Sequence, residues 1–521
     1  MHSELKLAEL LLTMKGRVGS VARLASKIGV TERALRTWLR KTEDGLHRVH
    51  QGNIEQIIKA ARDLGIEPEL FAQAPQLWNT KASFEENLQF DPGMPVSLGA
   101  PLRNHSIPFL GYTLNSRFGA SASVITSTPQ RVRFLAHAGG DVLTYKTVRS
   151  SNFRSHLPPN ILFCSDSVPV LDPENRSLPR VVVGDNPEVY KAAYGAMNRF
   201  GMPSPSPEVW QTEFRAAKSY MKEGQLLILS VVGTAKRTDS EDVLIKDTVK
   251  VVEQGLEAGA EIFEVNCSCP NCTGMEGELF HNVALVERIC KAIRQVARSA
   301  KIILKIGFLK ERELREFVVR TAPYVNGYSA INTVPVEGLR EGQGGLEPAF
   351  GMPKLKAGLS GLPIHRYGLN CVRSLAKIRA QENFKDIGII GIGGATTPAI
   401  VQNYIDNGAD IVQATTAFLI DSYFGIKVRR FLDSQLNSQD VSSEEEREIA
   451  TVNWSKAIAG LEFDFSNDEN FSRRIHEAAV AEILDWKRAH QATATLGPRR
   501  SLAVPSVDEF KERIRARMAR G

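Results

Sequence analysis

Three cysteines lie close together in the sequence, at Cys267, Cys269 and Cys272 in the segment Asn-Cys-Ser-Cys-Pro-Asn-Cys. A cysteine acts as a proton acceptor, a nucleophile or a metal ligand, depending on its neighbours. A zinc or iron–sulfur site would need a fourth ligand, and Cys290 falls in a helical pattern where a buried, inert thiol is the ordinary case. We therefore predict no metal site at this cluster; the roles of Cys267 and Cys272 stay open.

Amides and lysines come at the ends of several apolar runs. Asn198, Asn266 and Asn332 are three such amides, and Lys146 and Lys305 close two other runs. A lysine in an apolar strand often forms an ion pair or reaches the strand edge. Two lysines directed at one opening instead suit an anionic ligand. We expect these side chains to face one pocket.

A glycine-rich turn, Gly391-Ile-Gly-Gly394, follows another apolar run, and Thr415 and Thr416 follow the run Ile411–Ala414. Glycines let backbone N–H groups approach a phosphate, and threonine hydroxyls complete such a cradle. Alternatively, the glycines serve only to make a tight turn.

The elements that must position these residues alternate between strands and helices from 105 to 436. Expected helices include Lys246–Ala258 and Phe280–Arg298, and expected strands are Gln225–Val232, Glu261–Val265, Lys301–Ile306, Gly327–Ile331, Gly388–Ile392 and Ile411–Ala414. Repeated strand–helix units predict a parallel sheet, and over this length an α/β fold of the (βα)8 TIM-barrel type. The active site of such a barrel lies at the carboxyl ends of its strands.

The rest of the chain has a different character. The sequence predicts an all-α domain with a helix-turn-helix over residues 1–75. It predicts a linker over residues 76–104 and a helical C-terminal extension over residues 437–521. In the predicted recognition helix, exposed Arg33, Arg36 and Arg40 could contact DNA. The alternative is a solvated face on a small helical adaptor.

The composition excludes several classes of protein. The 65 basic and 59 acidic residues give a formal net charge of +6, too small by itself to indicate a nucleic-acid-binding protein. We find no apolar run of about 18 residues and no cleavable leader, and expect a cytoplasmic protein with no membrane partner.

Four motifs occur in a family order: Asn198–Pro203, Asn266–Asn271, Gly358–Gly361 and Ile389–Gly394. With them, residues 107–425 resemble the dihydroorotate dehydrogenase family, FMN-dependent αβ barrels that include the flavin domain of dihydropyrimidine dehydrogenase. The Cys at position 269, where the membrane-bound class has Ser, resembles the soluble type.

The resemblance implies roles for individual residues. Cys269 matches the catalytic base, and Lys146 lies beside the isoalloxazine and the substrate. Matches to the substrate-binding positions are Asn198, Asn266, Asn271, Asn332 and Thr333. Matches to the FMN-binding positions are Ala120, Ser121, Lys146, Thr147, Lys305, Ile331, Gly361, Gly393, Gly394, Thr415 and Thr416.

These roles imply an FMN-dependent oxidoreductase that acts on dihydroorotate or a related dihydropyrimidine, working as a homodimer. Its base takes a proton from C5 of the ring, and a hydride passes from C6 to flavin. Asparagine amides suit the alternating N–H and C=O groups of a pyrimidine edge. An alternative is a helix-turn-helix regulator whose flavin barrel senses a ligand or redox state, and a third possibility is an adaptor subunit.

Overall fold

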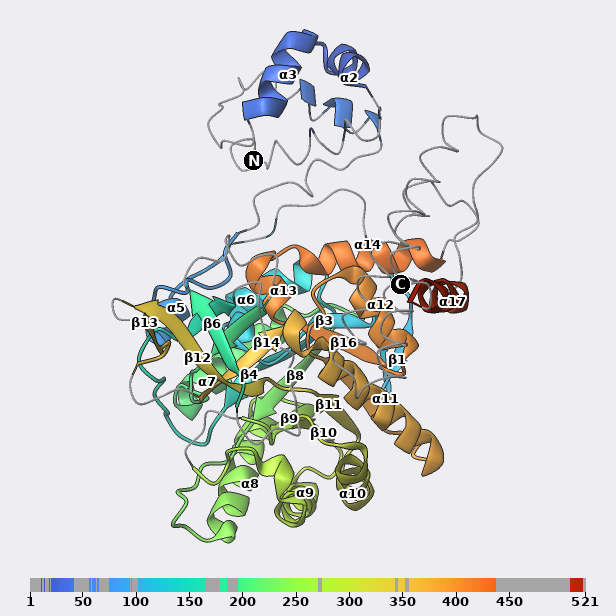
Figure 1. Cartoon of the computed structure of the whole chain (residues 1–521). Coiled ribbons are helices and arrows are strands. Elements are labelled where there is room, and N and C mark those ends of the chain that lie inside the picture. Colours follow the sequence, from blue (N-terminus) through green and yellow to red (C-terminus); the bar gives the residue numbers. More distant parts are fainter. Residues whose placement is uncertain are drawn as a thin grey trace. The chain divides into compact units, whose positions relative to one another are not determined.

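The computed structural model describes 11, 14, 18, 20–41, 56–57, 59–61, 63–64, 75–93, 95, 102–164, 178–184, 195–269, 274–342, 345–351, 356–436 and 507–518 (Figure 1). The chain divides into two compact units. One consists of Met1–Gln76 with Gly93–Leu102, and the other of Leu77–Pro92 with Arg103–Gly521. We describe each unit by itself.

The larger unit is built on a closed barrel of eight parallel strands, as the sequence predicts. Each strand pairs with the next barrel strand along the chain, and the last pairs with the first. The strands are β3 (Phe118–Ala120), β4 (Val142–Val148), β8 (Leu226–Val231), β9 (Ile262–Asn266), β10 (Lys301–Ile306), β11 (Gly327–Ala330), β15 (Gly388–Ile392) and β16 (Ile411–Ala414). Nearly all their residues are buried, because such strands face side chains inside the barrel and helices outside it.

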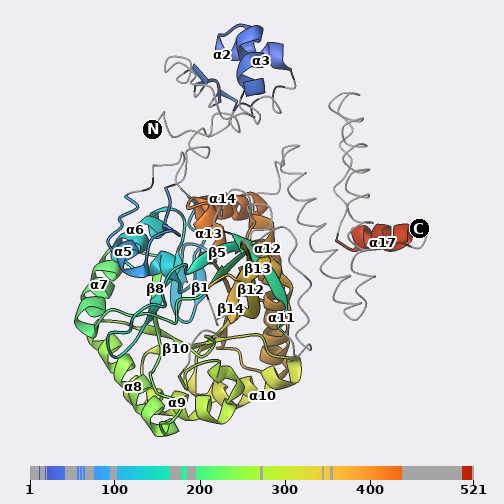
Figure 2. The same ribbon diagram turned by 60° about the vertical axis from the view of Figure 1, so that its left-hand side comes forward.

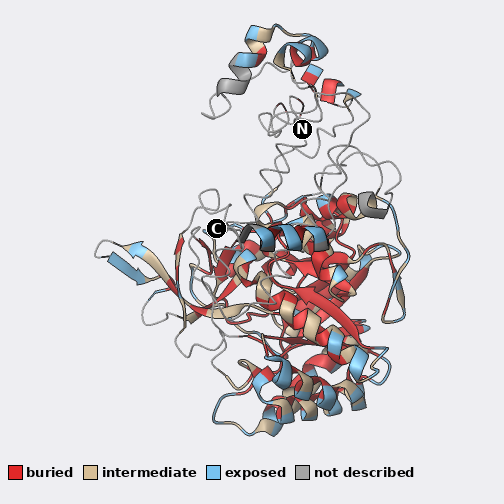
Figure 3. Ribbon diagram, turned by 45° about the vertical axis from the view of Figure 1, so that its right-hand side comes forward, coloured by how far each residue is buried: buried red, intermediate tan, exposed pale blue. Residues whose placement is uncertain are grey.

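Helices form a ring outside the strands, with apolar faces turned inward (Figures 2 and 3). They are α6 (Pro129–His137), α7 (Pro207–Ser219), α8 (Glu241–Glu257), α9 (Val283–Val296), α10 (Glu311–Thr321), α11 (His365–Gln381), α12 (Pro398–Asp406), α13 (Thr416–Ile420) and α14 (Phe424–Leu436). Helix α8 begins five residues before the predicted start, where Glu241 and Asp242 favour a helix N-terminus. Helix α9 begins later than predicted, because Asn282 caps it through the Leu285 amide.

A hairpin closes the amino-terminal end of the barrel. It pairs β1 (Ile107–Phe109) with β2 (Tyr112–Leu114). Phe109 and Leu114 are buried in one cluster with Val142, Leu226 and Ile411, the first residues of three barrel strands. The opposite end of the barrel is therefore the one left for a site.

A second sheet is formed by the segments inserted after β4 and β11, and the sequence analysis did not predict it. Its order is β13-β12-β14-β7-β5-β6. The strands are β5 (Ile161–Cys164), β6 (Arg180–Gly184), β7 (Gly195–Asn198), β12 (Val334–Gly342), β13 (Gly345–Pro348) and β14 (Lys356–Gly361). The pairing of β7 with β14 joins residues about 160 positions apart, which local periodicity does not reveal.

Part of the predicted linker packs with the barrel unit. Leu77–Pro92 includes α5 (Phe84–Leu88), capped by Ser83. Trp78 and Phe84 are buried, and the Trp78 ring meets the Phe200 ring edge-on at 5.7 Å. Arg131 Nε donates to the Leu77 carbonyl at 2.9 Å. Two buried aromatic rings hold this segment against the barrel unit. Because two residues make no periodic sequence pattern, the segment was predicted as a linker.

The smaller unit contains α2 (Val21–Ile28) and α3 (Glu32–Lys41). The Ser20 side chain caps α2, and Gly29 ends it with φ of 80°, a conformation that glycine adopts readily. Leu24, Ile28 and Leu35 share one apolar core. Whether this arrangement is a DNA-binding helix-turn-helix stays a prediction.

Near the other end of the chain lies α17 (Val507–Met518). Its Phe510 and Ile514, four positions apart on one helix face, are buried. No helix in the described part of the chain is both long enough and apolar enough to cross a bilayer.

Gly119 sets how closely β3 approaches β4. A Cβ atom at this position would lie 1.7 Å from the Val142 carbonyl oxygen. We expect Gly119→Ala to lower the free energy of unfolding by roughly 3 kcal/mol or more, measured by urea denaturation, because backbone must move. Gly140→Ala is the control, since its closest atom is the movable Leu143 Cδ2 at 2.9 Å. Equal stability of the two variants would contradict this account.

Candidate functional site

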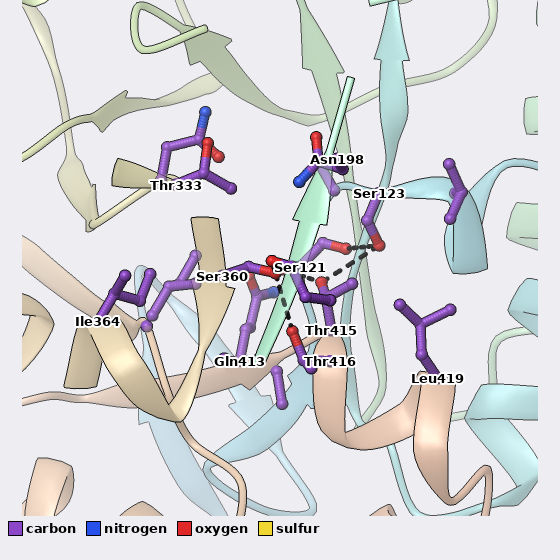
Figure 4. Close-up of a pocket in the computed structure, with 18 of the residues that line it drawn as sticks. Ser121, Ser123, Asn198, Thr333, Ser360, Ile364, Gln413, Thr415, Thr416 and Leu419 are labelled. Atoms are coloured by element: carbon purple, nitrogen blue, oxygen red, sulfur yellow. Dashed lines mark hydrogen bonds between the residues drawn. The ribbon is translucent and has the colours of Figure 1, made fainter. Parts of the chain in front are cut away.

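A cavity lies at the carboxyl ends of the barrel strands, under the second sheet (Figure 4). The barrel contributes residues that end β4, β9, β10, β11, β15 and β16 or follow them. The second sheet contributes Ile161 of β5, Ala196 and Asn198 of β7, and Ser360 and Gly361 of β14. The cavity wall therefore combines both sheets.

Most residues singled out in the sequence line this one cavity. They are Ser121, Lys146, Thr147, Asn198, Asn266, Cys269, Lys305, Ile331, Asn332, Thr333, Gly361, Gly393, Gly394, Thr415 and Thr416. Ala120 is buried on β3 immediately before Ser121 and does not line the cavity. Asn271 and Cys272 lie outside the described residues, as does the side chain of Arg40. The individual roles expected of these residues remain predictions.

Asn266 is held in a fixed orientation at the end of β9. Its Nδ2 donates to Thr147 Oγ1 at 3.1 Å, and its Oδ1 accepts from the Ser268 amide at 3.2 Å. Asn332 Nδ2 in turn donates to the Ser268 carbonyl at 3.0 Å. These bonds link the carboxyl ends of β4, β9 and β11, which fixes the amides before any ligand binds.

Cys269 follows the same strand and is only 6% exposed. It packs against Met202 and Val232 in a small apolar cluster. The Glu278 amide donates to the Cys269 carbonyl at 3.1 Å, so the returning part of the loop braces it. The thiol therefore lies at the cavity wall in a partly apolar setting.

The other described cysteines are buried thiols with little reactivity. Burial raises the pKa of Cys267 to about 12, and the charge of Glu264 adds to the effect. Burial likewise raises the pKa of Cys164 and of Cys371 to about 12. Among the described residues, no group of three or more His, Cys, Asp or Glu side chains is arranged to hold a metal.

Two lysines bring positive charge to the cavity. Lys305 is 2% exposed, and its Nζ lies 3.9 Å from Glu264 Oε1 inside the barrel. Lys146 is 9% exposed at the end of β4. A buried ammonium group next to a cavity favours a ligand that is anionic or becomes so.

Hydroxyl groups gather on another part of the wall. Ser121 Oγ lies 2.7 Å from Thr415 Oγ1, which also donates to Ser123 Oγ at 3.2 Å (Figure 4). Thr416 Oγ1 lies 3.1 Å from Ser360 Oγ. Thr416 begins helix α13, which has only five residues. The cluster offers several donors to an oxyanion such as a phosphate.

The glycine turn beside these hydroxyls rests on His365. A Cβ atom at Gly394 would lie 2.6 Å from His365 Cβ, so only glycine fits. The His365 ring meets the Tyr404 ring edge-on at 5.4 Å, and Tyr404 donates to the Gly393 carbonyl at 2.6 Å. His365 and Tyr404 thus support one side of the turn, and Gly393 and Gly394 line the cavity on the other side.

Several cavity residues were not singled out from the sequence: Ser123, Phe200, Met202, Ser360, Thr396 and Gln413. Ser360 lies inside the motif Gly358–Gly361, and a polar Gln413 within an apolar strand was a visible signal. Gln413 is fully buried, and its Nε2 donates to the Val142 carbonyl at 3.0 Å. Phe200 and Met202 lie inside the motif Asn198–Pro203, but their apolar side chains did not indicate a site role.

Comparisons of the sequence with known proteins find dihydroorotate dehydrogenases. A sequence model described as dihydroorotate dehydrogenase matches residues 183–436, which lie within the larger unit. The dihydroorotate dehydrogenase of Dictyostelium discoideum is 29% identical over 366 residues, covering 67% of this chain and 96% of that protein. The dihydroorotate dehydrogenase B (NAD(+)) catalytic subunit of Pyrococcus horikoshii is 28% identical over 251 residues, covering 46% of this chain and 71% of that subunit. The crystal structure of ligand-free DHODH from Eimeria tenella has a TM-score of 0.48 at 16% identity, covering 65% of this chain and 90% of that one.

His365 makes the stability of the site depend on pH. Burial lowers its pKa from 6.5 to about 4; the charge of Arg373 adds to this, and a hydrogen bond with the Gly393 backbone opposes it. The unfolded chain therefore takes up the proton first, so the stability present above pH 6.5 is lost as the pH falls towards 4. Between pH 7 and 4.5, we expect the free energy of unfolding to fall by about 2 kcal/mol less in the His365→Gln variant than in the unaltered protein. Denaturation curves across this range measure it, and identical pH dependence in both proteins would refute it.

Proposed function

We propose that this chain is a member of the dihydroorotate dehydrogenase family, oxidoreductases that act on a CH–CH group, and that it oxidises dihydroorotate or a related dihydropyrimidine with FMN as its cofactor. The observation that carries the proposal is the convergence of amides, a thiol and two lysines on one cavity at the carboxyl end of the barrel. That set matches the chemical needs of the reaction at each point.

The cavity fits FMN by the chemistry of its donors. The hydroxyl groups around Thr415, together with the turn at Gly393 and Gly394, suit the phosphate, because hydroxyl and amide groups donate to oxyanions. The Lys305 ammonium suits the part of the ring system that gains negative charge on reduction. Lys146 and Thr147 also line the cavity, and in the proposed function they contact the flavin ring system beside the substrate.

The amides suit the substrate ring. An asparagine side chain presents one acceptor and two donors, which complements the N–H and C=O groups of a pyrimidine. Asn198, Asn266, Asn332 and Thr333 all border the cavity. Because Asn266 is already oriented by Thr147 and Ser268, it binds the ring at little entropic cost.

The proton is taken by Cys269. Its thiolate accepts the proton from C5, the electron pair of that C–H bond forms the C5–C6 double bond, and a hydride leaves C6. FMN, when bound, accepts this hydride. Met202 and Val232 beside the thiol restrict water, so that Cys269 meets the ring rather than solvent.

We expect the purified protein to show a flavin spectrum that is bleached anaerobically by one member of a panel containing dihydroorotate, dihydrouracil and dihydrothymine. The ring that bleaches it fastest identifies the substrate. A protein without flavin after reconstitution with FMN, or with flavin that no member of the panel reduces, would end the proposal.

Cys269→Ser tests the base. A serine hydroxyl is a much weaker acid than a thiol, so at pH 7 we expect flavin reduction to slow by about 100-fold or more while FMN stays bound. The matched control is Cys371→Ser, a buried cysteine on α11 that does not line the cavity. Stopped-flow absorbance measures both variants, and an unchanged rate in Cys269→Ser removes it as the base.

A second function, DNA binding by the smaller unit, is favoured by one observation. Helices α2 and α3 share a core across the turn at Gly29, while Arg33 and Arg36 are exposed on α3. Arg36 Nε donates to Glu32 at 2.8 Å on the same helix. We propose that this surface contacts DNA phosphates; a cytoplasmic location and a homodimer likewise remain proposals.

We expect the double variant Arg33→Ala, Arg36→Ala to weaken DNA binding and to reduce the slope of log K against log salt by about 2, one for each lost phosphate contact. Fluorescence anisotropy with duplex DNA at several salt concentrations measures this. Arg320→Ala in the larger unit, an exposed arginine paired with Glu287, is the control. Equal binding by the double variant and the control would leave α3 as a solvated face.

A further inference from the structure

Arg149 has no role in the chemistry described so far, yet it is among the most completely buried charged residues. It follows β4 directly, and it is 0% exposed. Its guanidinium lies over the Phe153 ring at 4.0 Å. A buried charge of this kind is costly unless it makes specific bonds, so its partners reveal what it does.

The guanidinium joins the loops that follow three other strands. Nε donates to the Met202 carbonyl at 3.0 Å, in the loop after β7. NH1 donates to Thr234 Oγ1 at 2.8 Å, in the loop after β8. NH1 and NH2 both lie 3.2 Å from Glu276 Oε1, in the loop after β9.

Two of these three loops form the surroundings of Cys269. Glu276 is 2% exposed, and the residues after it brace the cysteine: Gly277 forms a backbone bridge with Cys269, and the Glu278 amide donates to its carbonyl. On the other side, Met202 packs directly against Cys269. Arg149 therefore holds the neighbours of the thiol on both flanks.

We propose that the Arg149–Glu276 ion pair is the positioning device for the Cys269 thiol. The inference rests on the proposed function, in which Cys269 is the base. Neither side chain lines the cavity, so both act through the loop and through Met202. Guanidinium suits this task better than ammonium, because its planar fork donates in several fixed directions at once.

Glu276→Gln and Arg149→Lys test the two sides of the pair. We expect each to slow anaerobic flavin reduction by dihydroorotate by about 10- to 100-fold, with little change in substrate affinity, because a small displacement of a base is costly. Combined with Cys269→Ala, Glu276→Gln should change the residual rate by less than about 2-fold, since no thiol remains to be positioned.

Alkylation supplies a readout independent of turnover. We expect iodoacetamide to modify Cys269 about 10-fold faster in Glu276→Gln than in the unaltered chain, because the backbone contacts of Gly277 and Glu278 with Cys269 loosen. Peptide mass spectrometry follows Cys269 against Cys371 as an internal reference. A general loss of stability would accelerate both cysteines, whereas loss of positioning accelerates Cys269 alone.

Asp141→Asn is the matched control. Asp141 lies just before β4, at the opposite end of the strand from Arg149, and it pairs with Arg429 while only 1% exposed. We expect this variant to lose stability but to keep the rate of flavin reduction and the slow alkylation of Cys269. The control thus separates loss of a buried ion pair from loss of this particular one.

Two results overturn the inference. In the first, the Glu276→Gln variant reduces flavin at the unaltered rate although the Cys269→Ala variant is slow. In the second, Glu276→Gln slows the reaction by the same factor whether or not Cys269 is present. A fast Cys269→Ala variant would instead refute the base role in the proposed function. In that case the rate of Cys269 alkylation relative to Cys371 decides by itself whether the Arg149–Glu276 pair holds Cys269 in place.

Discussion

Closure of the barrel is the constraint on which the rest of the molecule depends. Eight short parallel strands satisfy one another's backbone groups only as a complete ring, and the ring forces all their carboxyl ends to one opening. Ser121 and Thr415 illustrate the result, since they lie 294 positions apart and their hydroxyl groups are 2.7 Å from each other. The pairing of β16 with β3 brings them together.

The barrel alone does not complete the cavity. Asn198 and Ser360 come from β7 and β14 of the second sheet, which pair antiparallel in the insertions after the second and sixth barrel strands. Ser360 Oγ donates to the Ala196 carbonyl at 2.8 Å and lies 3.1 Å from Thr416 Oγ1, so it joins the second sheet to α13, the helix that follows the last barrel strand. The site is thus complete only when the two insertions pair through β7 and β14.

The division between predicted and unpredicted features follows from the range of the interactions. Strands such as Lys301–Ile306 are largely apolar runs, and a polar residue near the carboxyl end, here Lys305, is visible by local inspection. The family motifs then indicated which of these residues belong together. The second sheet escaped prediction because its pairing is non-local, and the docked segment around Trp78 because two aromatic residues make no period. Arg149 and Glu276 escaped for the same reason, since 127 positions separate them.

The buried ion pair of Lys305 and Glu264 is better explained by the electrostatics of the proposed reaction than by a contribution to stability. Lys305 and Glu264 are both almost fully buried, and at 3.9 Å their ion pair is long. Such a pair does not recover the full cost of removing both charges from water. Hydrocarbon side chains in the barrel interior would be at least as stable, but in the proposed function they could not stabilise the negative charge that develops on a reduced flavin. An ammonium group fixed in place before the reaction needs no reorganisation when that charge develops, which is where electrostatic catalysis is most effective. The stability given up inside the barrel and the reactivity at its opening are therefore two consequences of the same arrangement.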